Sequence, residues 1–194
     1  MESGELATRI CQQIADVFTV PIVSPSALSI LVDEIKTVSS RSGKVFLFSV
    51  GREGLMLKAF CMRLYHLGLQ AHCVFDMNTP PCSDNDLLIA SAGPGGHATI
   101  NVICEKAKSS GARVVLLTAQ PQTGSATPFA SIVAHIPAQT MADDRERLAD
   151  PQLLPMGSVY EGSLFVLFEM VVYKLVKLLG QSPEQIRARH TNLE

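Results

Sequence analysis

The stretches VFLFSVGREG (residues 45–54) and LLIASAGPGGH (residues 87–97) decide the fold. Each begins with a run of apolar residues typical of a buried strand and then reaches a glycine-bearing turn that opens a helix. Glycine lets the backbone approach a ligand closely, and the start of a helix offers N–H groups that have no partner within the helix. We therefore expect the two turns to converge at the carboxyl ends of parallel strands and to form one crevice for a ligand.

Short β-rich runs alternate with helical stretches over residues 44–136. The predicted strands are 44–50, 71–75, 86–91, 113–118 and 131–136, and the predicted helices are 54–67, 98–109 and a short one near 124–130. Strands and helices that alternate in this way form a parallel sheet with helices on both faces. The sequence therefore predicts an α/β fold.

Further helices flank this alternating region. Apolar residues at helical spacing predict two helices ahead of the sheet, over 5–17 and 25–39, the second with Ser24 as its cap and Pro25 in its first turn. Behind the sheet, we expect a long helix over 158–179 and a last short helix that Pro183 opens after the cap residue Ser182.

Composition indicates a single domain with a small partner. A chain of 194 residues with 47% apolar residues suits one domain, with N-terminal helices in 1–40, a sheet core in 44–136 and C-terminal helices in 158–194. Sixteen basic and eighteen acidic residues nearly balance, so no basic surface favours nucleic acid or anionic lipid. The most apolar stretch, 164–179, carries three charged residues, so we expect a buried helix there and no membrane span.

Cysteine usage and the N-terminus predict a cytoplasmic protein. The five cysteines are an odd number and have no C-x-x-C spacing, and most lie among apolar neighbours, which is typical of reduced core thiols. Acidic residues occupy the first positions, where a leader would carry basic residues, and no apolar segment follows them.

A dinucleotide site is the first alternative for the second turn. Residues 93–98, GPGGHA, formally contain the spacing Gly-x-Gly-x-x-Ala of dinucleotide-binding folds. Such a site needs an acidic residue about 20 positions further on, at the end of the next strand, to hold the ribose. The next strand here ends VLLTAQ (115–120) without a carboxylate, and the turn follows an interior strand. We therefore disfavour a nicotinamide cofactor.

From Lys44 to Glu194 the chain instead resembles the sugar isomerase (SIS) domain family, most closely its 6-phospho-3-hexuloisomerase branch. Four blocks in the same order carry the resemblance: GR (51–52) with LKAFCMRLYHLG (57–68), TPP (79–81), PMGSVYE (155–161) and RHTNLE (189–194). The resemblance implies a three-layer α/β/α, flavodoxin-like SIS domain with a five-stranded parallel sheet. It also implies a sugar phosphate in the crevice and aldose–ketose isomerisation through an enediol, without metal or organic cofactor.

The resemblance also assigns roles to residues. It places the base that moves the proton at Glu161, and at His190 an acid/base partner that acts on oxygen, often in the site of a neighbouring subunit. It therefore implies a homodimer or homotetramer whose site is shared, and it makes TPP (79–81) part of the site wall. Taken alone, Glu161 also fits a favourable first-turn acid, and His190 fits a solvated histidine near a chain end.

The two turns depart from the family pattern. Glu53 stands where the family has its first serine, Ala92 and Pro94 replace two further serines, and His97 replaces a threonine. A phosphate next to Glu53 meets a like charge, unless that side chain turns outward. Protonated His97 can supply a replacement donor at the helix start. Glu53 equally suits the hydroxyl or amine of an uncharged or amino-bearing polyol, or a solvent-facing position in the first turn of its helix.

We predict ligand contacts at both turns: Ser49, Gly51, Arg52, Glu53, Ser91, Gly93, Gly95, Gly96, His97 and Thr99. Two functions remain open from the sequence. One is a sugar-phosphate isomerase of the hexulose phosphate type, favoured by Glu161 and His190. The other is a non-catalytic SIS-domain module that binds a sugar or sugar phosphate, favoured by the altered turns.

Overall fold

The computed structural model describes residues 2–21, 24–143 and 153–193. Its centre is a five-stranded parallel sheet with the strand order β2-β1-β3-β4-β5. The strands are β1 (Val45–Phe48), β2 (Ala71–Cys73), β3 (Leu87–Ser91), β4 (Arg113–Thr118) and β5 (Ile132–His135). Each begins and ends within two residues of its predicted bounds, because the apolar runs are the parts of the chain that become buried.

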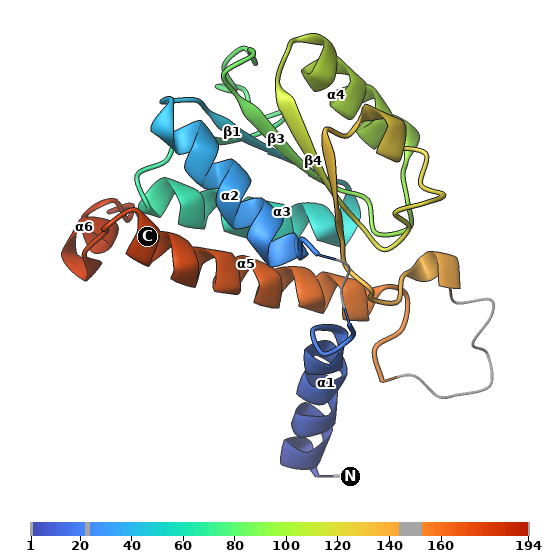
Figure 1. The fold of residues 1–194 in the computed structure, drawn as a ribbon. Helices are drawn as coiled ribbons and strands as arrows, with labels where there is room; N and C mark the ends of the chain where they lie inside the picture. The colour runs from blue at the N-terminus through green and yellow to red at the C-terminus, as the bar shows by residue number, and fades with distance from the viewer. Residues whose placement is uncertain (1, 22–23, 144–152, 194) are drawn as a thin grey trace.

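The described residues also form six α-helices: α1 (Ser3–Val17), α2 (Ala27–Ser40), α3 (Gly51–His66), α4 (Ala98–Ser109), α5 (Ser158–Leu178) and α6 (Pro183–Ala188). Alternate residues of each strand point into two cores. Val45 and Leu47 of β1 join the core with α2, α3 and α5, whereas Phe46 and Phe48 join the core with α4. Figure 1 shows α2, α3 and α5 on one face and α4 on the other, which confirms the predicted three-layer α/β/α arrangement.

The strand order places the two glycine-bearing turns next to each other. The chain passes from β1 outward to β2, returns across β1 to β3, and then continues through β4 to β5. The direction of winding therefore reverses between β1 and β3, and ligands of open parallel sheets bind at such a reversal, outside the carboxyl ends of the strands. The turn after β1 and the turn after β3 both lie there.

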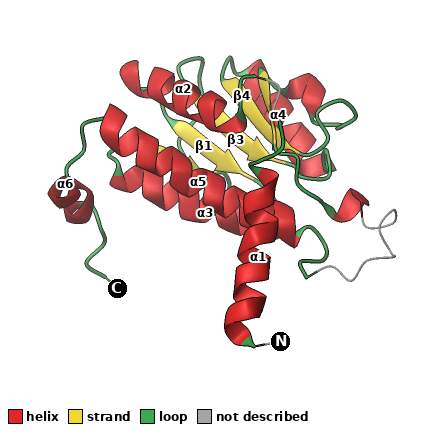
Figure 2. Cartoon of the chain, turned by 60° about the horizontal axis from the view of Figure 1, so that its bottom comes forward, coloured by secondary structure: helices red, strands yellow, loops and turns green. Residues whose placement is uncertain are grey.

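Helix α1 extends away from the body of the molecule. Only Val17, at its carboxyl end, is buried. Figure 2 shows α1 crossing the start of α5, and the two helices approach closely there: a Cβ on Gly162 of α5 would lie 2.7 Å from Ile14 Cδ1, so that the Ile14 side chain would have to shift.

Three predicted boundaries are wrong. Ser26, not Ser24, caps α2, because its hydroxyl accepts a hydrogen bond from the Ser29 N–H at 3.1 Å, which leaves Pro25 outside the helix. Helix α3 begins at Gly51 rather than at residue 54. The helix expected near 124–130 is a single 3₁₀ turn, η1 (Thr127–Phe129). The predicted Ser182 cap of α6 is confirmed, with a reciprocal capping box to Gln185.

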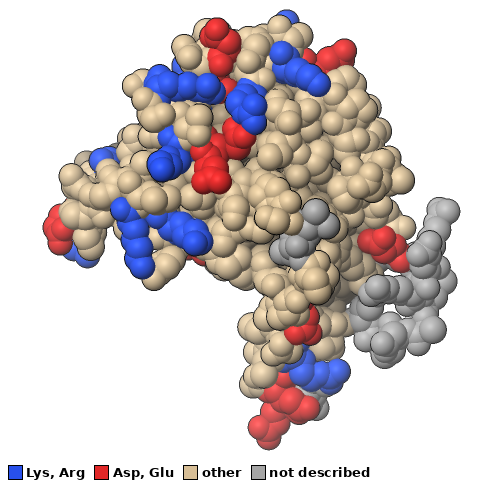
Figure 3. Space-filling model, in the orientation of Figure 1, with Lys and Arg blue, Asp and Glu red and all other residues tan. Residues whose placement is uncertain are grey.

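The outer surface carries charges of both signs. Acidic and basic side chains lie among one another on the face shown in Figure 3. Within the described residues, no helix combines the length and the apolar character that crossing a bilayer requires.

Candidate active site

The turns after β1 and β3 are joined by hydrogen bonds. The Ser49 hydroxyl donates to the Ser91 carbonyl at 2.7 Å. Glu53, in the first turn of α3, reaches across to β3, where one carboxylate oxygen accepts from the Ser91 hydroxyl at 2.6 Å and both oxygens lie 3.1 Å from the Gly93 N–H. The two turns therefore converge as the sequence predicts, and Glu53 supplies most of the hydrogen bonds between them.

Glu53 thus points into the molecule. The solvent-facing alternative is wrong for this side chain, because Ser91 and Gly93 present two donors toward it. Burial raises the pKa of the Glu53 carboxyl, while the bonds from Ser91 and Gly93 and the nearby His97 ring oppose that shift. The buried Tyr160 hydroxyl lies 3.2 Å from Ser91 Oγ and extends the network.

A cavity of about 210 Å³ opens beside this network. It lies between the first turn of α3, the turn after β3 and the start of α5. Its lining includes Gly51, Arg52 and Glu53 of the first turn, His97 of the second turn, and Tyr160 and Glu161 of the block 155–161. The structure therefore brings Glu161 together with both turns in one cavity.

The Glu161 side chain is only 13% exposed. Its Oε2 lies 3.0 Å from Arg52 Nη1, and Arg52 also donates to Ser158 Oγ at 3.0 Å. The contact with Arg52 is an ion pair without hydrogen-bond geometry, so among the described residues Oε2 is a buried acceptor that receives no hydrogen bond. Burial raises the pKa of the Glu161 carboxyl, Arg52 opposes the shift, and the Glu53 charge adds to it.

A tight turn places Glu161 at the cavity. Met156 and Gly157 precede α5 with φ angles of 55° and 83°, both in the left-handed region that favours glycine. This turn sends the chain directly into α5, so that Glu161 lies in the first turn of that helix. The positive end of the helix dipole there favours a carboxylate and partly offsets its burial.

The residues of the second turn have different surroundings. His97 is the exposed N-cap residue of α4 and lines the cavity, but its side chain makes no capping bond. Gly95 and Gly96 pack against the loop after β4, where added Cβ atoms would lie 2.9 Å from Gly124 Cα and 2.2 Å from Ser125 Oγ. Loop packing explains both glycines, and neither lines the cavity.

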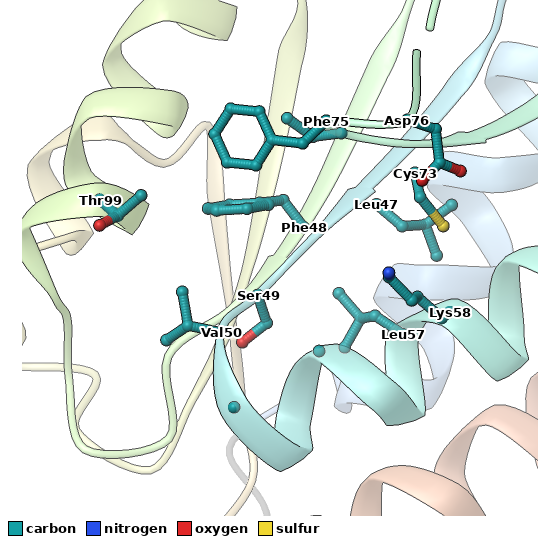
Figure 4. A pocket seen from close by; sticks show the side chains of 13 residues that line it. Leu47, Phe48, Ser49, Val50, Leu57, Lys58, Cys73, Phe75, Asp76 and Thr99 are labelled. Atoms are coloured by element: carbon teal, nitrogen blue, oxygen red, sulfur yellow. The ribbon is translucent and has the colours of Figure 1, made fainter. Parts of the chain in front are cut away.

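Ser49 and Thr99 lie on the other side of the α3 start. They line a second cavity of about 330 Å³ together with Phe48, Phe75 and Lys58, as Figure 4 shows. Six of the predicted ligand contacts are therefore divided between two neighbouring cavities that share Val50 and Gly51. The other four line neither cavity: Ser91, Gly93, Gly95 and Gly96.

His190 lies at the opposite end of α5. At about 1.5 Å per residue, the helix runs roughly 25 Å from Glu161 to its end at Leu178, and α6 follows. Arg189 holds this terminal segment, because its Nη1 donates to the carbonyl of His66 at 2.9 Å and to Gln181 Oε1 at 2.8 Å. The exposed His190 ring lies 5.3 Å from the His66 ring. Within one chain, His190 and Glu161 are not brought together.

The sequence analysis missed Tyr160 as a functional neighbour, although it directly precedes Glu161 in the chain and lines the same cavity. The expected role of TPP (79–81) in this site wall is wrong, because these residues line a separate cavity against Phe46 and Leu88, on the α4 face of the sheet. Over 2–21, 24–143 and 153–193, no group of three His, Cys, Asp or Glu side chains is suitably placed to hold a metal ion.

Comparison with known proteins gives consistent similarities. No family model matches the chain. It is 34% identical to a 3-hexulose-6-phosphate isomerase of Mycobacterium gastri, with 94% of this chain and 86% of that protein covered, and 34% identical to one of Bacillus subtilis, with 79% and 81% covered. A Methanococcus jannaschii protein, whose crystal structure was used to infer a 3-hexulose-6-phosphate isomerase function, superimposes with a TM-score of 0.80 at 26% identity over 98% of this chain and 99% of that one. An Escherichia coli protein solved in complex with a ligand shares the fold, with a TM-score of 0.73 at 20% identity and 98% and 100% covered.

Proposed function

The chain belongs to the sugar isomerase (SIS) domain family, together with the 3-hexulose-6-phosphate isomerases, and on that premise we propose that it isomerises a hexulose phosphate. The reaction moves a carbonyl group to the adjacent carbon through an enediol. The relatives named for 3-hexulose-6-phosphate support the substrate class. The observation that carries the proposal is the Glu161 carboxylate, which faces the cavity with a buried oxygen that accepts no hydrogen bond from the described residues.

Glu161 is suited to act as the base. It takes the proton from the carbon next to the carbonyl, which leaves an enediolate. It then returns that proton to the former carbonyl carbon, so that the carbonyl group appears on the adjacent carbon. A raised pKa makes the Glu161 carboxylate a stronger base toward the substrate carbon. Arg52 Nη1 lies 3.0 Å from Glu161 Oε2, and we assign its positive charge to stabilising the negative charge that develops on the enediolate oxygen.

Proton exchange tests this role directly. The protein is incubated with 3-hexulose 6-phosphate in D₂O, and deuterium at the carbon next to the carbonyl is followed by NMR. We expect Glu161→Gln to slow exchange about 10²–10⁴-fold, the usual contribution of a general base. Glu169→Gln is the matched control, because Glu169 is an exposed acid of the same helix. Exchange by Glu161→Gln at the unsubstituted rate would disprove the role.

His190 is proposed to serve the site of a neighbouring subunit, where it would move protons between oxygen atoms. Its position far from Glu161 within one chain supports a shared site. Exposed apolar side chains on the neighbouring helices α3 and α5 supply a surface for association: Leu55, Met62, Tyr65, Phe165 and Tyr173.

Subunit mixing tests the shared site. Glu161→Gln and His190→Ala proteins are each expected to be nearly inactive in the exchange assay. When they are unfolded, mixed and refolded together, a fraction of the sites receives an intact Glu161 from one chain and an intact His190 from another. We expect activity to return in the mixture and not in either protein refolded alone. No return of activity, with mixed oligomers confirmed by native mass spectrometry, would contradict the sharing.

A binding module without catalysis is the second candidate. The inward position of Glu53 favours it, because this carboxylate takes two donors that a phosphate would use. Binding of sugar phosphates without deuterium exchange in the assay above would support this function over the isomerase.

A further inference from the structure

Glu53 is the charged group of the cavity that the proposed proton transfer does not use. Its two carboxylate oxygens are held by the Ser91 hydroxyl at 2.6 Å and the Gly93 N–H at 3.1 Å. The fit is close on the glycine side, because a Cβ on Gly93 would lie 2.9 Å from Glu53 Oε1 and 2.9 Å from the Tyr160 ring. The carboxylate is therefore seated against the turn backbone.

The groups that hold Glu53 are those that bind anions in proteins. A hydroxyl and a backbone N–H from a glycine-bearing turn converge on one point beside the start of a helix. Glu53 supplies an anion at that point from within the chain. Since Ser91 is fully buried, its hydroxyl has the Glu53 carboxylate and the Tyr160 hydroxyl as partners and is not available to a ligand while Glu53 stays in place.

We propose that Glu53 is a specificity-determining residue that acts as an internal anion and competes with the phosphate of the substrate for the Ser91 hydroxyl and the Gly93 N–H. The inference rests on the proposed function, because it assumes that the phosphate enters this cavity. A sugar phosphate gains these donors only when Glu53 swings away. The consequence is weaker binding of phosphate esters than the turns would otherwise give.

The surrounding charges do not remove this competition. On α3, Arg52 is turned toward Glu161 and Ser158 and not toward Glu53. On α5, Glu161 adds a second negative charge to the cavity, and Tyr160 is buried. At the start of α4, His97 is the positively chargeable side chain on the Glu53 side. A phosphate that enters beside a seated Glu53 therefore meets two carboxylates.

Calorimetric titration with inorganic phosphate tests the competition without any need for turnover. Glu53→Gln removes the charge and keeps the shape, and Glu53→Ser removes both and frees the donors. We expect both variants to bind phosphate about tenfold more tightly or better, since relief of one close like-charge contact corresponds to at least that factor. Glu105→Gln, an exposed acid on α4 with the same change in net charge, is expected to bind like the unsubstituted protein.

Binding of a free ketohexose, which carries no phosphate, distinguishes relief of charge repulsion from a gain of space in the cavity. Its affinity is expected to stay within about twofold in Glu53→Gln, because no charge is relieved. Equal tightening for phosphate and for the free sugar would overturn the proposal, and so would unchanged or weaker phosphate binding in both Glu53 variants. Absence of isomerase activity in the presence of the expected binding changes would reject the proposed function and leave the competition standing.

Discussion

Two walls of one cavity each carry a glutamate, and the two carboxylates have opposite surroundings. Glu53, on the wall that joins the turns after β1 and β3, accepts hydrogen bonds from a hydroxyl and a backbone N–H. Glu161, on the wall that α5 provides, has the Arg52 guanidinium beside it and a buried oxygen that receives no hydrogen bond from the described residues. Burial raises the pKa of both carboxyl groups, so burial alone does not distinguish them.

The difference lies in what holds each side chain. Donors that converge on Glu53 fix its orientation and stabilise its charged form, which suits a structural or competing anion. Glu161 is paired with an Arg52 side chain that is 63% exposed. Opening this ion pair costs little free energy, because solvent screens such pairs. A carboxylate held this loosely can turn toward a substrate carbon and exchange a proton.

Removal of the Ser91 hydroxyl tests how firmly Glu53 is held, and it is expected to have the largest effect on stability. Ser91→Ala deprives the Glu53 carboxylate of its shortest hydrogen bond and leaves the buried Tyr160 hydroxyl without its Ser91 contact. Buried polar groups left unpaired cost about 1–3 kcal/mol each, so we expect the free energy of unfolding in urea to fall by about 2–4 kcal/mol.

Ser163→Ala is the matched control for that loss. Ser163 is equally buried, but its hydroxyl only adds a bond to the Val159 carbonyl within α5. Alanine is a better helix former than serine, so we expect a change of less than about 1 kcal/mol. Equal unfolding free energies for the two variants would show that Ser91 does not support Glu53.

The fold could be predicted because burial and periodicity decide it locally. The predicted bounds of α4 and β4, 98–109 and 113–118, match the structure to the residue, since helical spacing gives way to a continuous apolar run on either side of Gly111. The cap of α2 was misplaced because Ser24 and Ser26 are both good caps. The choice between them depends on where the backbone enters the helix, and it does so at Ser26, whose hydroxyl accepts from the Ser29 N–H.

The site could be predicted in part. Two glycine-bearing turns after neighbouring strands predict a shared crevice, and the helix that follows Gly157 delivers Glu161 to it. The inward direction of Glu53 depends on Ser91 and Gly93, which are about 40 residues away in the chain, so no local pattern contains it. The position of His190 depends on Arg189 and the carbonyl of His66, a contact of the same long-range kind.

Substitution of Arg52 is expected to have a smaller effect, a shift in the pKa of Glu161. Its charge lowers the pKa of Glu161, whereas the Glu53 charge raises it, so loss of each charge should move that pKa in opposite directions. A base must be deprotonated to act, and activity therefore falls as pH drops through its pKa. Arg52→Gln is expected to move the acid limb of the kcat/KM profile to higher pH, and Glu53→Gln to move it to lower pH. Arg63→Gln, which loses only the exposed 3.7 Å pair with Glu169, is expected to leave the limb in place. Limbs that move together in the Arg52 and Glu53 variants would mean that the titrating group is not Glu161.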